Sequence, residues 1–268
     1  MRNNYSQKKN VYLFSAEFWN KFALRTFYKP YFFPQLYSSY LQQIQFIEKN
    51  IDLNNTLILK TDMYVESQMD IVLFFERFKG NKFIVMDISL NVLKKAREYL
   101  VAHGIEAEYI VADVRNLPFR RETFDFIFSD STLDHIPQKE LGRALMDIKA
   151  FLRKDGSFCF SINNRYNYFL TLAKRIYKIL GMFPFVSFSF YPKEILTILM
   201  EQKWIISDFD YSMLLLPFQI LILKVMYRLK RPKEEVINFI SSLDKTLRKF
   251  HFLNKFVNAH FIYFLRNG

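Results

Sequence analysis

The chain contains three short apolar runs that each end at a carboxylate: FIVMDIS (residues 83–89), YIVADVRNLPF (109–119) and FDFIFSDSTLDHI (124–136). Runs this rich in Phe, Ile and Val are typical of strands buried in a parallel sheet. A doubly wound sheet binds its ligand outside the carboxyl ends of such strands. Asp87, Asp113 and Asp130 lie at these ends. Three successive carboxylates predict a nucleoside-bearing ligand across this edge of the sheet.

The central region alternates between apolar runs and amphipathic stretches. We expect strands near Leu57–Leu59, Phe83–Met86, Glu108–Val111, Phe124–Phe128 and Phe158–Ile162. We expect helices between them near Gln68–Phe78, Leu90–His103 and Lys139–Arg153. Repeated β–α units form a parallel sheet with right-handed crossovers, so the sequence predicts an α/β fold with a doubly wound sheet.

The flanking regions have a different pattern. Residues 11–50 are aromatic and helical in period, and they predict two helices with a break near Pro30 and Pro34. Beyond residue 162 we expect two helices and two strands, at 165–180, 192–202, 204–211 and 260–265. The predicted organisation has three parts: an N-terminal helical cap (1–50), a ligand-binding domain (51–211 with 259–268) and a helical insertion in the substrate lid (212–258).

Composition is that of a globular chain, with 51% apolar and 24% charged residues among 268. The single cysteine, Cys159, excludes an internal disulfide and is interpreted as a small buried residue rather than a nucleophile. The histidines are scattered, so we predict no metal site. The N-terminus does not resemble a signal peptide, and the most apolar window, Met213–Leu223, is too short for a membrane span. We therefore expect a cytoplasmic chain.

The net charge of +12 lies on the flanks. Residues 1–50 carry 7 basic and 2 acidic groups, residues 51–163 carry 15 and 17, and residues 164–268 carry 16 and 7. Such flanks could face an anionic membrane, at the cytoplasmic side, or nucleic acid. A solvated basic surface explains them equally well. Oligomeric state is not predicted.

Four motifs in order resemble the class I S-adenosylmethionine (SAM)-dependent methyltransferases, in the group that acts on small molecules and lipid precursors. They are MDIS with the helix LNVLKKAREYL, then ADVRNLPF, ETFDFIFSDSTLDHI and LGRALMDIKAFLRKDGSFCFSI. The resemblance covers about residues 55–162 well. It implies a Rossmann-like seven-stranded sheet, mostly parallel with an antiparallel last strand, plus a helical cap, and it implies SAM as cofactor.

The resemblance also implies roles at two strand ends. Asp87 would accept the ribose hydroxyls of SAM, although it could merely cap the next helix. Asp113 would accept the adenine amino group with the Val114 N–H facing a ring nitrogen, although an Asx-turn is the alternative. Ile88 could supply part of an apolar adenine wall or simply pack in the core.

The chain departs from the family after the first strand. The family has a glycine-rich turn there, whereas this segment reads LILKTDMYVES and residues 51–79 contain no glycine. A divergent subgroup is similar, with Lys-Thr-Asp in place of the glycine turn and Ser-Thr-Leu-Asp-His after the fourth strand. This chain has both, as Lys60-Thr61-Asp62 and Ser131–His135.

Charge could replace the bare backbone of that turn. The Lys60 ammonium would bind the methionine carboxylate of SAM, and Asp62 or Glu66 would face its α-ammonium. The alternative is a pair of Lys60 with Asp62 or Asp130 that only holds the loop. The residues leave these two interpretations equally open.

The segment after the fourth strand carries the candidate catalytic residues. His135 and Asp134 lie near the expected methyl group and could remove a proton from the acceptor, although a structural histidine is common here. Asp130 and Ser131 would line the methionine end of SAM.

We predict methyl transfer to a small or lipid-linked biosynthetic intermediate. The first alternative is a non-catalytic SAM-fold protein that acts as a membrane-associated partner or scaffold, as the missing glycine turn would allow. RNA methylation is third, because SDST does not match the Asn/Asp-Pro-Pro-aromatic motif of base-modifying enzymes. A nicotinamide-dependent oxidoreductase ranks last, because it needs a phosphate-binding glycine loop.

Overall fold

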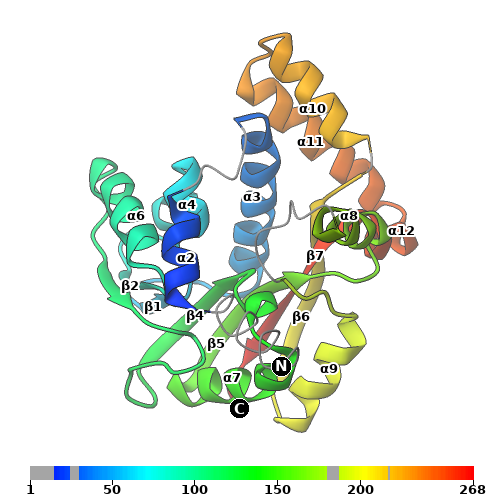
Figure 1. Cartoon of the computed structure of the whole chain (residues 1–268). Helices are drawn as coiled ribbons and strands as arrows, with labels where there is room; N and C mark the ends of the chain where they lie inside the picture. The colour runs from blue at the N-terminus through cyan, green and yellow to red at the C-terminus, as the bar shows by residue number, and fades with distance from the viewer. Residues whose placement is uncertain (1–14, 25–29, 180–186, 217) are drawn as a thin grey trace, which may run out of the picture.

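The computed structural model describes residues 15–24, 30–179, 187–216 and 218–268. A seven-stranded sheet in the order β3-β2-β1-β4-β5-β7-β6 forms its centre (Figure 1). The strands are β1 (Leu57–Lys60), β2 (Lys82–Asp87), β3 (Glu108–Val111), β4 (Phe124–Asp130), β5 (Leu152–Asn163), β6 (Ile205–Leu214) and β7 (Asn258–Arg266). The first five pair in parallel, and β7 pairs antiparallel with both β5 and β6. The predicted fold class is confirmed.

Helices cover both faces of the sheet. Those within the α/β alternation are α4 (Tyr64–Met69), α5 (Leu73–Arg77), α6 (Leu90–Ala102), the 3-10 turn η2 (Leu133–His135), α7 (Gln138–Phe151), α8 (Tyr168–Ile179) and α9 (Pro192–Glu201). The prediction of one helix over Gln68–Phe78 was wrong. Asp70 adopts a left-handed conformation, with φ 53°, and ends α4, so two short helices replace one.

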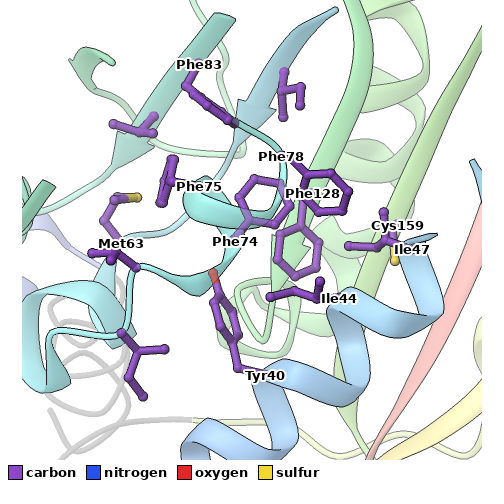
Figure 2. Close-up of a cluster of buried hydrophobic side chains, with 14 of the residues drawn as sticks. Tyr40, Ile44, Ile47, Met63, Phe74, Phe75, Phe78, Phe83, Phe128 and Cys159 are labelled. Atoms are coloured by element: carbon purple, nitrogen blue, oxygen red, sulfur yellow. The ribbon is translucent and has the colours of Figure 1, made fainter. Parts of the chain in front are cut away.

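The first hydrophobic core lies between the sheet and four helices, α3 (Phe33–Asn50), α4, α5 and α6. Figure 2 shows Phe74 and Phe75 of α5 packed against Phe83 of β2 and Phe128 of β4. The Phe74 and Phe128 rings stack with centroids 5.0 Å apart. This cluster anchors the segment between β1 and β2, so the turn that follows β1 is held between the sheet and a buried helix.

The second core lies on the other face of the sheet, under α7 and α9. Phe124 belongs to this core while Phe126 and Phe128 belong to the first one. The pairing of β4 with β5 also changes register between Phe124 and Phe126.

The N-terminal helices and the C-terminal insertion meet above the carboxyl ends of the strands. The elements are α2 (Ala16–Ala23), the 3-10 turn η1 (Pro30–Phe32), α3 (Phe33–Asn50), α10 (Gln219–Arg228), α11 (Lys233–Arg248) and α12 (His251–Val257). Gln42 Nε2 of α3 donates to Asp244 of α11 over 3.1 Å. In Figure 1 α10 and α11 stand beyond the end of α3, away from the sheet. None of the helices in these ranges has the length and apolar character needed to cross a bilayer.

Candidate functional site

A cavity of about 300 Å³ lies at the carboxyl ends of β1 to β4. Its walls come from the strand ends and from α2, α3, α8 and the start of β7. It is lined by ten of the twelve predicted site residues: Thr61, Asp62, Asp87, Ile88, Asp113, Val114, Asp130, Ser131, Asp134 and His135. Lys60 and Glu66 are fully buried and do not line it. The roles of all twelve residues remain predictions.

Asp87, at the end of β2, joins two segments of the cavity wall. Its Oδ1 accepts the N–H of Ser89 over 2.8 Å and its Oδ2 accepts the N–H of Met63 over 3.1 Å. Ser89, not Asp87, caps α6, because its Oγ accepts the N–H of Val92. Burial raises the pKa of Asp87 to about 7. Each carboxylate oxygen keeps a second lone pair, so ribose hydroxyls can still bind.

Asp113 is engaged locally as well as lining the cavity. Its Oδ1 accepts both the backbone N–H and the Nε–H of Arg115, each over 2.9 Å. The backbone contact is the Asx-turn that the sequence allowed. An adenine amino group would therefore share this carboxylate with the Arg115 guanidinium.

The Lys60 ammonium lies in a buried ionic network beneath the cavity. Its Nζ is 2.6 Å from the carbonyl oxygen of Asp62, 3.0 Å from Asp62 Oδ1 and 3.3 Å from Glu66 Oε1. Tyr40 of α3 donates its hydroxyl to the same Glu66 oxygen over 2.6 Å. Burial alone would lower the pKa of Lys60, but the carboxylates of Asp62 and Glu66 outweigh it and raise the pKa. The contacts are those of the loop-holding alternative.

Asp62 and Asp130 connect this network to the methionine side of the predicted site. Asp62 Oδ2 accepts the backbone N–H of Asp130 over 3.0 Å. Asp130 Oδ1 accepts hydrogen bonds from Gln43 Nε2, at 2.9 Å, and from Ser161 Oγ, at 2.6 Å. The cap helix α3 thus reaches the end of β4 through Gln43.

The far end of the cavity is organised around Asp134, which is completely buried. Its carboxylate accepts hydrogen bonds from Ser131 Oγ, Asn163 Nδ2 and Ser187 Oγ. His135 Nε2 lies 4.0 Å from Asp134 Oδ2, and its ring meets Trp19 of α2 edge to face, with centroids 5.0 Å apart. The two candidate catalytic residues therefore share one end of the cavity.

Polar wall residues that the sequence did not identify as site residues include Gln43, Asn163, Lys174 and His260. Burial lowers the pKa of Lys174 to about 8 and that of His260 to about 4. They come from α3, β5, α8 and β7, which are far apart in the chain. The only local signal is a polar residue within an apolar strand or helix face, as for His260 in β7, and it does not indicate which cavity the side chain faces.

The cavity suits a ligand with both polar and apolar parts. Four buried polar atoms in its wall lack a hydrogen-bond partner among the described residues: Gln43 Oε1, Thr61 Oγ1, Thr132 Oγ1 and His260 Nδ1. Buried polar atoms normally have partners, so these are available to a ligand. Apolar side chains such as Met86 and Val114 stand beside Asp87 and Asp113. No group of three or more His, Cys, Asp or Glu side chains in the described ranges is arranged to hold a metal ion.

Comparison with known proteins relates this fold and part of the sequence to methyltransferases. Residues 70–156, which run from the end of α4 into β5, match the family model of a methyltransferase domain. The chain contains a methyltransferase domain. The matched segment carries Asp87, Asp113, Asp130 and His135 but not the glycine-free turn after β1. No curated protein matches the sequence significantly.

Solved structures share the fold of this methyltransferase domain. A SAM-dependent methyltransferase from Methanosarcina mazei is 15% identical, with a TM-score of 0.55, over 82% of this chain and 96% of its own. Geranyl diphosphate C-methyltransferase from Streptomyces coelicolor is 10% identical, with a TM-score of 0.57, over 85% and 79%. Magnesium protoporphyrin IX methyltransferase from Synechocystis is 13% identical, with a TM-score of 0.56, over 87% and 84%.

The resemblance to class I SAM-dependent methyltransferases is confirmed: the family model matches a methyltransferase domain, and the solved structures share the fold. The last two of these enzymes were crystallised with S-adenosyl-L-homocysteine, and SAM is the cofactor of this class. The cavity fits such a cofactor, because it places a carboxylate, unpaired polar atoms and apolar side chains at the edge where the fold binds nucleosides.

Proposed function

We propose that this methyltransferase domain transfers a methyl group from SAM to a small or lipid-linked biosynthetic intermediate. One observation carries the proposal: a single cavity is lined by Asp87 and Asp113, which follow β2 and β3 on one side of the sheet, and by Asp134, Lys174 and His260, which come from the segment after β4, from α8 and from β7. Cofactor and acceptor could therefore bind next to each other in one continuous cavity. A cavity of about 300 Å³ is at the lower end of the usual range for small-molecule sites.

The cofactor half is electrostatically suited to SAM. When bound, SAM supplies an electrophilic methyl group on a positively charged sulfonium. Asp62, Asp87 and Asp130 line this half, and opposite charges at short range favour binding. Asp87 would hold the ribose, while Ile88 and Val114 would contact the base. Methyl transfer is an in-line displacement, so the positioning of the two reactants supplies most of the acceleration.

The acceptor half combines apolar side chains with a few polar groups. Leu170, Met213 and Leu215 line it together with Asn163 and His260. This mixture suits an acceptor with an apolar body and one polar reactive group. The two named neighbours act on geranyl diphosphate and on magnesium protoporphyrin IX, which supports a small-molecule acceptor here.

A proton acceptor is needed only if the methylated atom carries a proton that must leave. Of the two candidates, His135 and Asp134, only His135 keeps this proposed role. Asp134 already accepts three hydrogen bonds, so we assign it the orientation of neighbouring groups and His135 the proton transfer. The missing glycine turn is accommodated in this proposal by the Lys60 network, which holds the turn after β1 from below.

Isothermal titration calorimetry with SAM and S-adenosyl-L-homocysteine tests the proposal. We expect both to bind the wild-type protein, and Asp87→Ala to weaken binding by at least about tenfold, the typical effect of losing a hydrogen bond to a charged group. Asp147→Ala, which removes a carboxylate from α7 on the outer face, is the matched control and should bind normally. Absence of binding to the wild-type protein would contradict the proposal and favour a non-catalytic scaffold.

A further inference from the structure

Helix α8 has two chemically different sides. Leu170 and Lys174, one turn apart, line the cavity. The other side exposes an apolar stripe at intervals of three or four residues: Tyr168, Leu172, Ile176 and Ile179. Leu172 is 58% exposed and Ile179 84% exposed. Because a helix in a globular protein normally turns its apolar stripe to the core, an exposed stripe indicates a contact outside the chain.

Helix α12 extends this exposed apolar surface. The ring of Tyr168 stacks on Phe256, with centroids 6.1 Å apart and 23° between the ring planes. Phe252, one turn before Phe256, is 66% exposed. Figure 1 shows α8 and α12 next to each other. We define the α8–α12 face by six exposed residues: Tyr168, Leu172, Ile176, Ile179, Phe252 and Phe256.

The sequence around the α8–α12 face lacks negative charge. Three stretches, 156–193, 211–233 and 245–268, contain no Asp or Glu, and each contains five Lys or Arg. They include all of α8, α10 and α12. Arg175 is exposed beside the α8 stripe, and Lys255 Nζ lies 4.8 Å from the centroid of Phe256. Every charged side chain in these three stretches is therefore a cation.

We propose that the α8–α12 face binds the surface of an anionic lipid bilayer. The aliphatic and aromatic side chains would enter the boundary between headgroups and acyl chains, and the surrounding cations would contact lipid phosphates. Exposed apolar residues on basic helices are the features that interfacial helices share. The binding is peripheral, since it uses one side of each helix.

Two other occupants fit these observations less well. A nucleic acid would bind the cations, but Leu172, Ile176 and Ile179 offer nothing to a phosphate or to a base edge. A second copy of the chain would cover the apolar side chains, but pairing this face with itself would bring two basic surfaces together, and like charges across an interface oppose association. A bilayer with anionic lipids satisfies both the charge and the apolar area.

This surface would also explain how a lipid-linked acceptor reaches the cavity, a step that rests on the proposed function. Helix α8 separates the α8–α12 face from the cavity. Its Leu170 and Lys174 line the cavity, while Leu172 and Ile176 are exposed on the outside. A protein resting on the bilayer through α8 would hold the acceptor end of the cavity, at Lys174 and His260, close to the lipid surface. The acceptor class would then be a lipid with a polar headgroup.

Co-sedimentation with vesicles tests the proposal on the full chain. We expect binding to phosphatidylcholine vesicles that contain about 30 mol% phosphatidylglycerol, and much weaker binding to pure phosphatidylcholine or at high salt. The double variant Leu172→Ser/Ile176→Ser should lose at least about tenfold in partition coefficient. The matched control Val101→Ser/Met200→Ser removes two equally exposed apolar residues from α6 and α9 and should bind as the wild type does.

Several outcomes would overturn the proposal. These are no sedimentation with the anionic vesicles, an equal loss in the control variant, or binding to a single-stranded RNA that Leu172→Ser/Ile176→Ser abolishes. Light scattering that shows a dimer which this variant converts to a monomer would likewise overturn it. SAM calorimetry on the same samples separates this proposal from the proposed function. If the wild type binds SAM but not the vesicles, only the membrane proposal fails. If the wild type binds the vesicles but not SAM, only the proposed function fails.

Discussion

Lys60 and Glu66 form a buried ion pair, with Nζ 3.3 Å from Oε1, and neither side chain reaches the cavity above them. The pair lies under the glycine-free turn that follows β1. Glu66 also binds the Tyr40 hydroxyl, and Asp62 binds the backbone N–H of Asp130. The turn after β1 is therefore held by the charges of Lys60, Asp62 and Glu66 and by hydrogen bonds from α3 and β4.

We expect Lys60→Met to lower the free energy of unfolding by about 3–5 kcal/mol, because it leaves the buried carboxylates of Asp62 and Glu66 without a counter-charge. Urea denaturation followed by circular dichroism measures the effect. Glu66→Gln introduced into the Lys60→Met variant should restore part of the loss, since it removes one unpaired charge. A loss below about 1 kcal/mol would show that the network is solvated and not structural.

We expect Asp87 to make SAM binding pH-dependent. Burial raises the pKa of this carboxyl from its ordinary value of 3.8 to about 7. Between these values the folded protein keeps a proton that the unfolded chain has released, so the contribution of Asp87 to stability falls as the pH rises from 3.8 to about 7. Ribose hydroxyls donate to the ionised form, so SAM affinity should rise by about tenfold between pH 6 and pH 8. Calorimetry on Asp87→Asn, which does not titrate, should show no such rise.

Asp113 should discriminate between bases by their exocyclic group. If it accepts the adenine amino group, S-inosyl-homocysteine, which has an oxygen there, should bind at least about tenfold more weakly than S-adenosyl-homocysteine. Asp113→Asn should reduce this difference, because an amide can donate to the oxygen. Equal affinities of the wild type for both compounds would mean that Asp113 serves only to hold Arg115.

His260 should make the protein acid-sensitive. Burial lowers the pKa of His260 from 6.5 to about 4. The unfolded chain therefore binds a proton in this range that the folded chain does not, and the stability that depends on neutral His260 is present above pH 6.5 and lost as the pH falls toward 4. Asp134, Lys174 and His135 are the charged or titratable groups that face it.

We expect the wild type to lose about 2–3 kcal/mol more than His260→Gln when denaturation is compared at pH 7 and pH 4.5. His251→Gln, an exposed histidine of α12, is the matched control and should lose as much as the wild type. Parallel pH curves for the wild type and His260→Gln would place the acid sensitivity elsewhere.

The strand ends were predictable because a parallel sheet leaves a local signature. The apolar runs that end at Asp87, Asp113 and Asp130 reveal buried strands, and the carboxyl ends of parallel strands share one edge, so neighbours in the sheet could be inferred from pattern alone. The sequence also determined the fold class and the capping of α6 by Ser89. It did not determine the break at Asp70, because a non-glycine residue in a left-handed conformation has only a weak local signal.

Only the tertiary structure decided what each charged group faces. Lys60, Asp62 and Glu66 are close in sequence under either interpretation, and burial against Tyr40 of α3 turned them into a network below the cavity. Gln43, Lys174 and His260 reach the same cavity from elements far apart in the chain. Side-chain direction depends on how α3, α8 and β7 pack across the sheet, and such long-range packing is not encoded in the periodicity of any single segment.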